Sequence, residues 1–210
     1  MKIDIPIKVM VSMEDLSKTQ LMTGDEAYLE TYQQIYQLFC QKAQVLYGNP
    51  YAFENPKVQT QELCIELAGI NEEIRRVEKD FWISVERCKE AAQVFSVEKI
   101  ADLHNLDVFE KRVMLLLIFL KINQPSDQGY SPEQILQILD VNNSVTERFK
   151  NLFYFSNKPS AFVKEILMVS QRNYPRVQEM EYQINPKIMR QISSLVRGEV
   201  QGWSKADQDS

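Results

Sequence analysis

The chain has 210 residues with a formal net charge of −5, and it contains 44% hydrophobic and 25% charged residues. This composition is typical of a soluble globular protein with one ordinary domain or two small ones. It argues against a general nucleic-acid binder, whose basic surface usually shows in the total charge. The charge is uneven, however, because residues 143–190 hold eight Lys and Arg against four Asp and Glu, whereas residues 1–142 are acidic. We therefore expect any anion-binding surface late in the chain.

The cysteines and the single histidine do not have the spacing of a metal or catalytic site. Cys40, Cys64 and Cys88 lie far apart inside helical patterns, whereas zinc sites use close pairs. His104 stands at a helix end without the placed nucleophile and orienting group of a catalytic triad. We expect no cofactor, no metal and no enzymatic activity. The N-terminus has no apolar leader segment, so we expect a cytoplasmic location.

Residues 2–11 have the period of a half-buried strand, since Ile or Val occupies every second position from Ile3 to Val11. Pro6 cannot donate a backbone hydrogen bond, so this strand is expected at the edge of a sheet. We predict that it closes a small sheet in its own chain. The alternative is that it adds to the sheet of a partner.

Two long helical patterns follow. Residues 25–47 carry apolar and aromatic side chains at steps of three and four, and Gly-Asn-Pro at 48–50 ends the pattern. The next pattern, which begins after Pro56, contains two rows with the seven-residue spacing of a coiled coil. The rows are Leu63, Ile70, Val77, Ser84 and Ala91, and Leu67, Ile74, Phe81, Cys88 and Phe95. The short connection predicts an antiparallel helical hairpin, which together with the edge strand makes a first unit over residues 1–95.

The second helix, at about 50 Å, should be longer than the first, at roughly 35 Å, and its C-terminal end must pack on something else. Phe81, Cys88 and Phe95 form the candidate interaction seam at that end. Either the following domain covers this seam or a second copy of the chain does. Because Ser84 and Ala91 make the seam too thin for a strong coiled-coil dimer, we predict burial within the chain and a monomer.

Residues 107–122 are the most apolar stretch, and we predict that they form the core helix of a second unit. The unbroken apolar run, 113–120, is too short for a membrane span, which needs roughly 20 residues. Asp107 and Glu110 have the spacing that caps the start of such a helix. Ser96 can cap a short helix that precedes it and ends near His104.

Two further capped helices and a pair of strands follow the core helix. Ser131 and Ser144 each start a capping pattern, and the helix after Ser144 places Phe149 and Phe153 on one face. Strand patterns then occupy 162–170 and 177–184, and a last helix follows at 187–196.

The order helix, helix, helix, strand, strand is that of a winged helix, a variant of helix-turn-helix. We predict a mainly α fold with a small β-hairpin: a long helical hairpin followed by a winged-helix-like domain over residues 96–196. The polar composition of residues 197–210 predicts a loose tail.

Two segments of the second unit carry a family resemblance. The run IADLHNLDVFEKRVMLLLIFLKI at 100–122 resembles the leucine-rich part of the winged-helix domain that precedes the ATPase module in a group of bacterial AAA-type ATPases. The run YQINPKIMRQI at 182–192 resembles the end of that domain, where a strand leads into a helix marked by proline. The resemblance implies a winged helix that acts with an AAA-type ATPase. No G-x-x-x-x-G-K-[ST] loop is present, so no ATPase activity is expected.

Two functions remain open. The first is a protein-interaction or adaptor module, with Phe81, Cys88 and Phe95 as the candidate seam. The second is a DNA-binding regulator that uses the third helix and the strand pair, with the candidate basic surface Arg148, Lys150, Lys158, Lys164, Arg172 and Arg176. Glu147 and Glu165 interrupt that surface, so the protein partner is favoured. We expect no membrane contact.

Carboxylates are numerous in the second helix, where Glu72, Glu73, Glu78 and Asp80 stand close together. On an exposed helix face such residues are ordinary solubilising charges, and we expect that role for all four.

Overall fold

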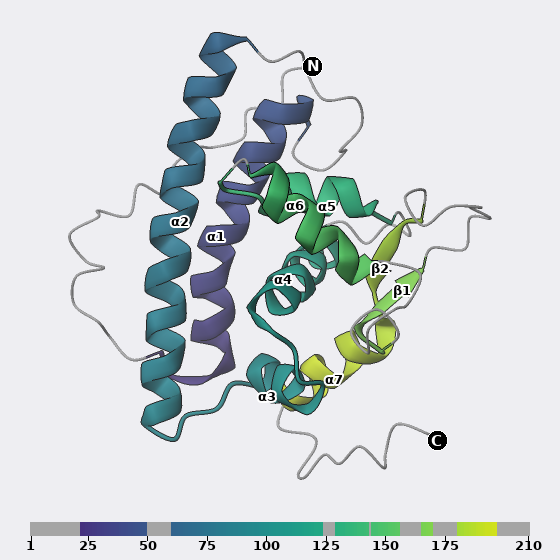
Figure 1. Ribbon diagram of the computed structural model, residues 1–210. Helices are drawn as coiled ribbons and strands as arrows, with labels where there is room; N and C mark the ends of the chain where they lie inside the picture. Colours follow the sequence, from purple (N-terminus) through teal and green to yellow (C-terminus); the bar gives the residue numbers. More distant parts are fainter. Residues whose placement is uncertain are drawn as a thin grey trace, which may run out of the picture.

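The computed structural model describes residues 22–49, 60–123, 129–142, 144–155, 165–169 and 180–196. Within these ranges the fold is mainly α with a small antiparallel sheet, as predicted (Figure 1). The helices are α1 (Gly24–Tyr47), α2 (Gln61–Glu90), α3 (Ser96–Leu103), α4 (Val108–Asn123), α5 (Pro132–Leu139), α6 (Val145–Leu152) and α7 (Pro186–Val196). A 3-10 turn, η2 (Phe153–Phe155), extends α6, and the strands are β1 (Leu167–Val169) and β2 (Tyr182–Ile184). The strand predicted at 2–11 and the tail at 197–210 lie outside the described residues.

Helices α1 and α2 form the predicted antiparallel hairpin (Figure 1). Gly48, with φ of 77°, ends α1 in the left-handed conformation, and the Thr60 side chain caps the start of α2. The first turns of α2 extend past the end of α1, and Ile65 is exposed there. Helix α2 also extends past the start of α1 at its C-terminal end, where the overhang was predicted and where the chain continues into α3 (Figure 1).

The buried side of α2 agrees with one of the two predicted rows. The buried residues of α2 are Leu67, Asn71, Ile74, Glu78, Phe81, Val85 and Cys88. The row that begins at Leu67 is thus confirmed as buried, but the row that begins at Leu63 is wrong by one position. Its members are half-buried or exposed, and the true second row includes two polar residues. Because Asn71 and Glu78 are polar, a search for apolar residues at this spacing selects their neighbours Ile70 and Val77 instead.

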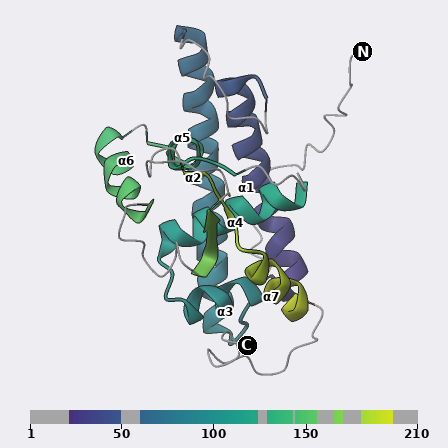
Figure 2. The same cartoon turned by 90° about the vertical axis from the view of Figure 1, so that its right-hand side faces the viewer.

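Helix α4 lies in the middle of the molecule, and residues 113–120 are all buried (Figures 1 and 2). Phe119 of α4 packs against α1, with ring centroids 5.5 Å from Tyr32 and 5.3 Å from Tyr36. Buried residues of the hairpin and of the C-terminal half belong to one continuous hydrophobic core. None of the helices in the described residues is long and apolar enough to cross a membrane.

A buried carboxylate reinforces the link between the hairpin and the C-terminal half. Glu98, at the start of α3, is fully buried and lies 2.8 Å from the Lys89 ammonium and 3.0 Å from that of Lys111. The Tyr28 hydroxyl of α1 donates a hydrogen bond of 2.9 Å to the same carboxylate. Burial alone would raise the pKa of Glu98, but the two ammonium groups outweigh it and lower the pKa. Glu98 therefore stays charged and joins four helices.

The small sheet packs against the end of the core. Leu167 of β1 pairs with Ile184 of β2, and an isolated bridge joins Tyr130, just before α5, to Tyr182. Strand β2 is buried, and the ring of Phe155 packs at a tilt against that of Tyr182, with 5.3 Å between the ring centroids. The described strands lie within the predicted ranges 162–170 and 177–184, and most of the remainder of those ranges is outside the described residues.

Candidate functional site

The predicted basic surface is small in the part of the chain that the structure describes. Lys158, Lys164, Arg172 and Arg176 lie outside the described residues. Arg148 and Lys150 are both on α6, where Lys150 is exposed. Arg148 is half-buried, and its Nε atom lies 2.6 Å from Oδ2 of Asp140. The charge of Arg148 is therefore already neutralised within the chain.

The candidate seam lies inside the molecule. Phe81 and Phe95 are both buried, with ring centroids 5.0 Å and 4.9 Å from that of Tyr28 in α1. Cys88 is also buried, and its Sγ atom lies 3.7 Å from the backbone oxygen of Met22. These three side chains are covered by their own chain, so they offer no surface to a partner.

A partly buried polar cluster lies where α5 ends. Arg112 of α4 binds Glu78 of α2 through two hydrogen bonds, Nε to Oε1 at 2.8 Å and Nη2 to Oε2 at 2.9 Å. Its Nη2 atom also donates to the backbone oxygen of Leu139, the last residue of α5, at 3.0 Å. Glu78 is buried, so the prediction that it is an exposed solubilising charge is wrong. A planar guanidinium that binds both carboxylate oxygens offsets the cost of burying that charge.

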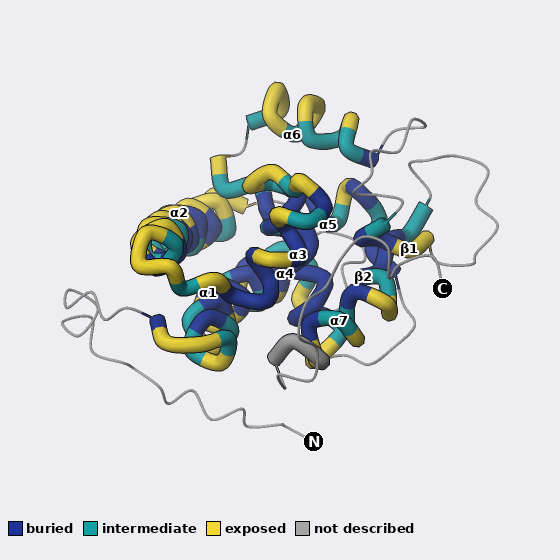
Figure 3. The backbone as a smooth tube through the Cα atoms, turned by 90° about the horizontal axis from the view of Figure 1, so that it is seen from below, coloured by how far each residue is buried: buried dark blue, intermediate teal, exposed yellow. Residues whose placement is uncertain are grey.

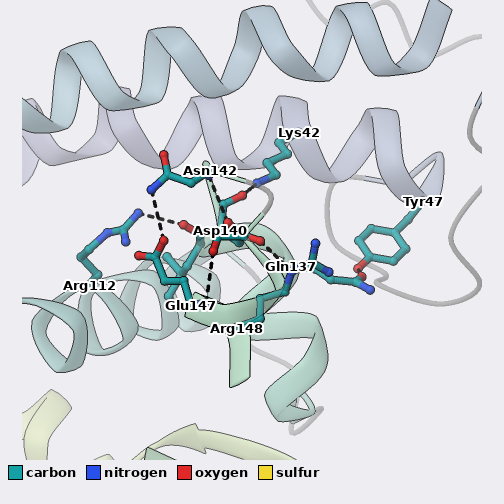
Figure 4. Close-up of polar contacts among 10 residues, drawn as sticks. Lys42, Tyr47, Arg112, Gln137, Asp140, Asn142, Glu147 and Arg148 are labelled. Atoms are coloured by element: carbon teal, nitrogen blue, oxygen red, sulfur yellow. Dashed lines mark hydrogen bonds and ion pairs between the residues drawn. The ribbon is translucent and has the colours of Figure 1, made fainter. Parts of the chain in front are cut away.

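Asp140 is the centre of the remaining contacts (Figure 4). The buried ammonium of Lys42, on α1, donates a hydrogen bond to the backbone oxygen of Asp140. The Asp140 carboxylate accepts a hydrogen bond from the Asn142 backbone at 3.0 Å and pairs with Arg148 of α6. Lys42, Glu78, Arg112, Asp140 and Arg148 are called the α5 corner network below. Through this network, α1, α2, α4 and α6 are all attached to the end of α5.

The network has one group with a strongly displaced pKa. Burial lowers the pKa of Lys42 to about 7, with Arg112 and Arg148 acting in the same direction and Asp140 and Glu78 opposing them. A lysine with a low pKa is a candidate nucleophile, but it must reach a substrate. Lys42 is 3% exposed and does not line the small pocket beside the network. We interpret the network as a structural joint.

A metal site is also not indicated: in the ranges that the structure describes, no group of His, Cys, Asp and Glu residues could hold a metal ion.

The most exposed apolar row in the C-terminal half lies on α6 and η2. Val145, Phe149 and Phe153 are 63%, 64% and 74% exposed and follow one another at steps of four residues. This spacing places them on one side of the helix over roughly 12 Å. We call these three residues the α6 apolar face. The sequence showed that Phe149 and Phe153 share a side, but Val145 was missed, although the same step of four could have found it.

Helix α6 is held by its other side. Arg148 and Asn151 line the pocket beside the corner network, while none of the residues of α6 is buried. Tyr154 of η2 donates a hydrogen bond to Asp107 and packs on Phe109, at 4.7 Å between ring centroids. Figure 3 shows the exposed turns of α6 at the margin of the molecule. The helix is therefore fixed in place while its apolar face points to solvent.

Contiguous apolar side chains on a surface mark sites for proteins, membranes or ligands. The α6 apolar face is thus the candidate functional site, and the α5 corner network is its support. Comparisons with protein-family models, curated proteins and solved structures found no match for this chain.

Proposed function

We propose that this protein is a non-catalytic interaction module that binds another protein through the α6 apolar face. The observation that carries the proposal is the exposure of Val145, Phe149 and Phe153, each above 60%. Folding alone gains nothing from leaving two phenylalanines in water, because each buries a large area when it is covered. Exposed aromatic residues on a fixed helix are typical of the anchor residues of protein interfaces.

The same proposal assigns a winged-helix arrangement to the C-terminal half. The order α4, α5, α6, β1, β2 supports it, as does the bridge between Tyr130 and Tyr182, which adds a sheet position between the first two helices. In this arrangement α6 is the third helix, the one that helix-turn-helix proteins present to their target. The resemblance to the domain next to bacterial ATPase modules makes an AAA-type ATPase the first partner to test.

The chemistry of α6 favours a protein target over DNA. A helix that reads a DNA groove presents polar and basic side chains to bases and phosphates. On α6 the exposed row is apolar, and Arg148 is paired with Asp140. Of the candidate basic residues that the structure describes, this leaves Lys150, which by itself would supply little of the phosphate neutralisation on which DNA affinity depends.

Affinity capture from the source cells tests the proposal with matched variants of the full chain. The test variant carries Phe149→Glu and Phe153→Glu. The control carries Ile65→Glu and Ile122→Glu, which are 67% and 58% exposed and add the same charge outside the α6 apolar face. All four positions are exposed, so circular dichroism should show the folded protein in both cases.

We expect a partner that the parent and the control retain and that the α6 variant loses. If all three proteins retain the same partners, the α6 apolar face is not the binding surface. A labelled DNA duplex is added as a separate assay, and binding that weakens steeply with salt would favour the DNA regulator instead.

A further inference from the structure

The α6 apolar face has the geometry of a helix-packing ridge. Its residues follow the i, i+4, i+8 row, and such rows interdigitate with the grooves of another helix in the commonest class of helix packing. In that class the helices cross at about 50°, so the contact is confined to a few turns. The row from Val145 to Phe153 covers between two and three helical turns, about the length of such a contact. The face is therefore suited to one helix of a partner.

The area of the face sets a lower limit on the size of the partner. A fully covered aromatic side chain buries roughly 150–250 Å², so the two phenylalanines together with the smaller Val145 provide on the order of 400 Å². A stable interface buries about 800 Å² on each partner. The α6 apolar face is thus about half of what is needed, and the occupant must also contact the residues that border the face.

The border of the face is basic. Thr146 and Lys150 lie along one side of the row, and both are exposed. Lys150 forms no ion pair with any residue in the described ranges. On the other side of the row, Arg148 is paired with Asp140. Glu147, which accepts a hydrogen bond from the neutral amide of Asn142, lies about 160° around the helix from Phe149 and so does not border the face. The unneutralised charge beside the face is therefore positive.

This charge disfavours a second copy of the chain as the occupant. A symmetric pair of α6 helices would be antiparallel about Phe149, and the two-fold axis would bring the two Lys150 side chains together. Like charges at neighbouring positions of packed helices are destabilising. A partner with a carboxylate at this border would instead gain an ion pair that is partly shielded from water.

We infer that the occupant of the α6 apolar face is an amphipathic helix of another protein, with an acidic residue that pairs with Lys150. Its large apolar side chains recur at steps of three and four residues and pack between Val145, Phe149 and Phe153. This inference rests on the proposed function and adds the chemical class of the partner.

Two labelled synthetic peptides test the inference by fluorescence anisotropy with the full chain. Both are helical and share leucines at steps of three and four, but the residues beside the leucines are Glu in one and Lys in the other. We expect the Glu peptide to bind about tenfold more tightly at low salt and the difference to shrink as salt is added. Lys150→Glu should reverse this preference, and Phe149→Glu should abolish binding of the Glu peptide.

The control variant with Ile65→Glu and Ile122→Glu should bind the Glu peptide as the parent does. Equal affinity for the two peptides would show that the partner needs no acidic residue to pair with Lys150. If neither peptide binds while cellular capture still depends on Phe149, the helical partner is wrong and the proposed function stands. If neither peptide binds and cellular capture does not depend on Phe149 either, the proposed function itself is wrong. A dimer mass in light scattering that reverts to a monomer with Phe149→Glu would make the second copy the occupant.

Discussion

The surroundings of Lys42 oppose its charge. Its ammonium is buried between α1 and the end of α5, and its hydrogen bond to the backbone oxygen of Asp140 replaces the water it has lost. Burial lowers its pKa to about 7, whereas a lysine in the unfolded chain titrates near 10.4. Between these two pH values the unfolded chain binds a proton that the folded chain does not. Stability should therefore increase with pH across this window.

We predict that Lys42→Met removes this pH dependence. From pH 7 to 9 the free energy of unfolding of the parent should rise relative to that of the variant, by up to about 1.4 kcal/mol per pH unit. Below pH 7 both states of the parent are protonated, and the difference should level off. Urea denaturation at several pH values measures it. Parallel curves for the two proteins would show that Lys42 titrates normally.

A second prediction at the scale of single residues compares two glutamates. Glu98→Gln leaves the buried ammonium group of Lys111 and the half-buried one of Lys89 without their carboxylate, and this should cost roughly 3–5 kcal/mol. Glu73→Gln removes an ion pair with Arg76 whose side chains are both 39% exposed, and this should cost less than about 1 kcal/mol. Equal losses in chemical denaturation would contradict the buried role of Glu98.

Contacts between residues far apart in the chain could not be predicted from the sequence. Glu78 and its partner Arg112 are 34 positions apart, and Lys42 and Asp140 are 98 apart. A local pattern contains no information about such pairs. A glutamate on a helix is exposed more often than not, so the sequence favoured the wrong environment for Glu78.

At the scale of elements the sequence was more informative, because helix starts are encoded locally. Asp107 and Glu110 exchange the expected hydrogen bonds, and Ser131 with Gln134 forms a complete capping box. The pattern at Ser144 is half realised: its hydroxyl caps the helix, but the Glu147 side chain binds Asn142 instead. Periodicity shows which side chains share a side of α6. It cannot show that this side is uncovered.

Helix α4 supplies the prediction for this scale. Leu116 is buried in the middle of the core, so Leu116→Asp places an unpaired charge there and should cost at least several kcal/mol, enough to unfold the protein. Ile122, near the end of the same helix, is largely exposed, and Ile122→Asp should change stability by less than about 0.5 kcal/mol. Thermal melting followed by circular dichroism compares the two. Similar melting temperatures would show that α4 is not the centre of the core.

At the scale of the molecule, the sequence separates a hairpin over residues 1–95 from a second unit over 96–196, because the pattern changes there. The packing joins them. Phe119 of α4 contacts Tyr32 and Tyr36 of α1, and the buried Glu98 accepts a hydrogen bond from Tyr28. Amphipathic patterns reveal an apolar side on each helix, but the partner of each side depends on contacts between distant parts of the chain.

This shared core predicts that the hairpin and the C-terminal half unfold together. With Trp203→Phe, the tryptophan fluorescence comes from Trp82 of α2, whose ring lies 5.2 Å from the Lys111 ammonium of α4. Its urea transition should coincide with that of the whole chain by circular dichroism. Phe119→Ala should cost about 3–5 kcal/mol, because it opens a cavity between the two halves. Hydrogen exchange should then show weaker protection of α1 and α2 as well as of α4. Two outcomes would show that the halves are independent: Phe119→Ala weakens the protection of α4 but not that of the hairpin, or the two probes give separate transitions. In either case α1 could not help to hold the α5 corner network on which the α6 apolar face depends.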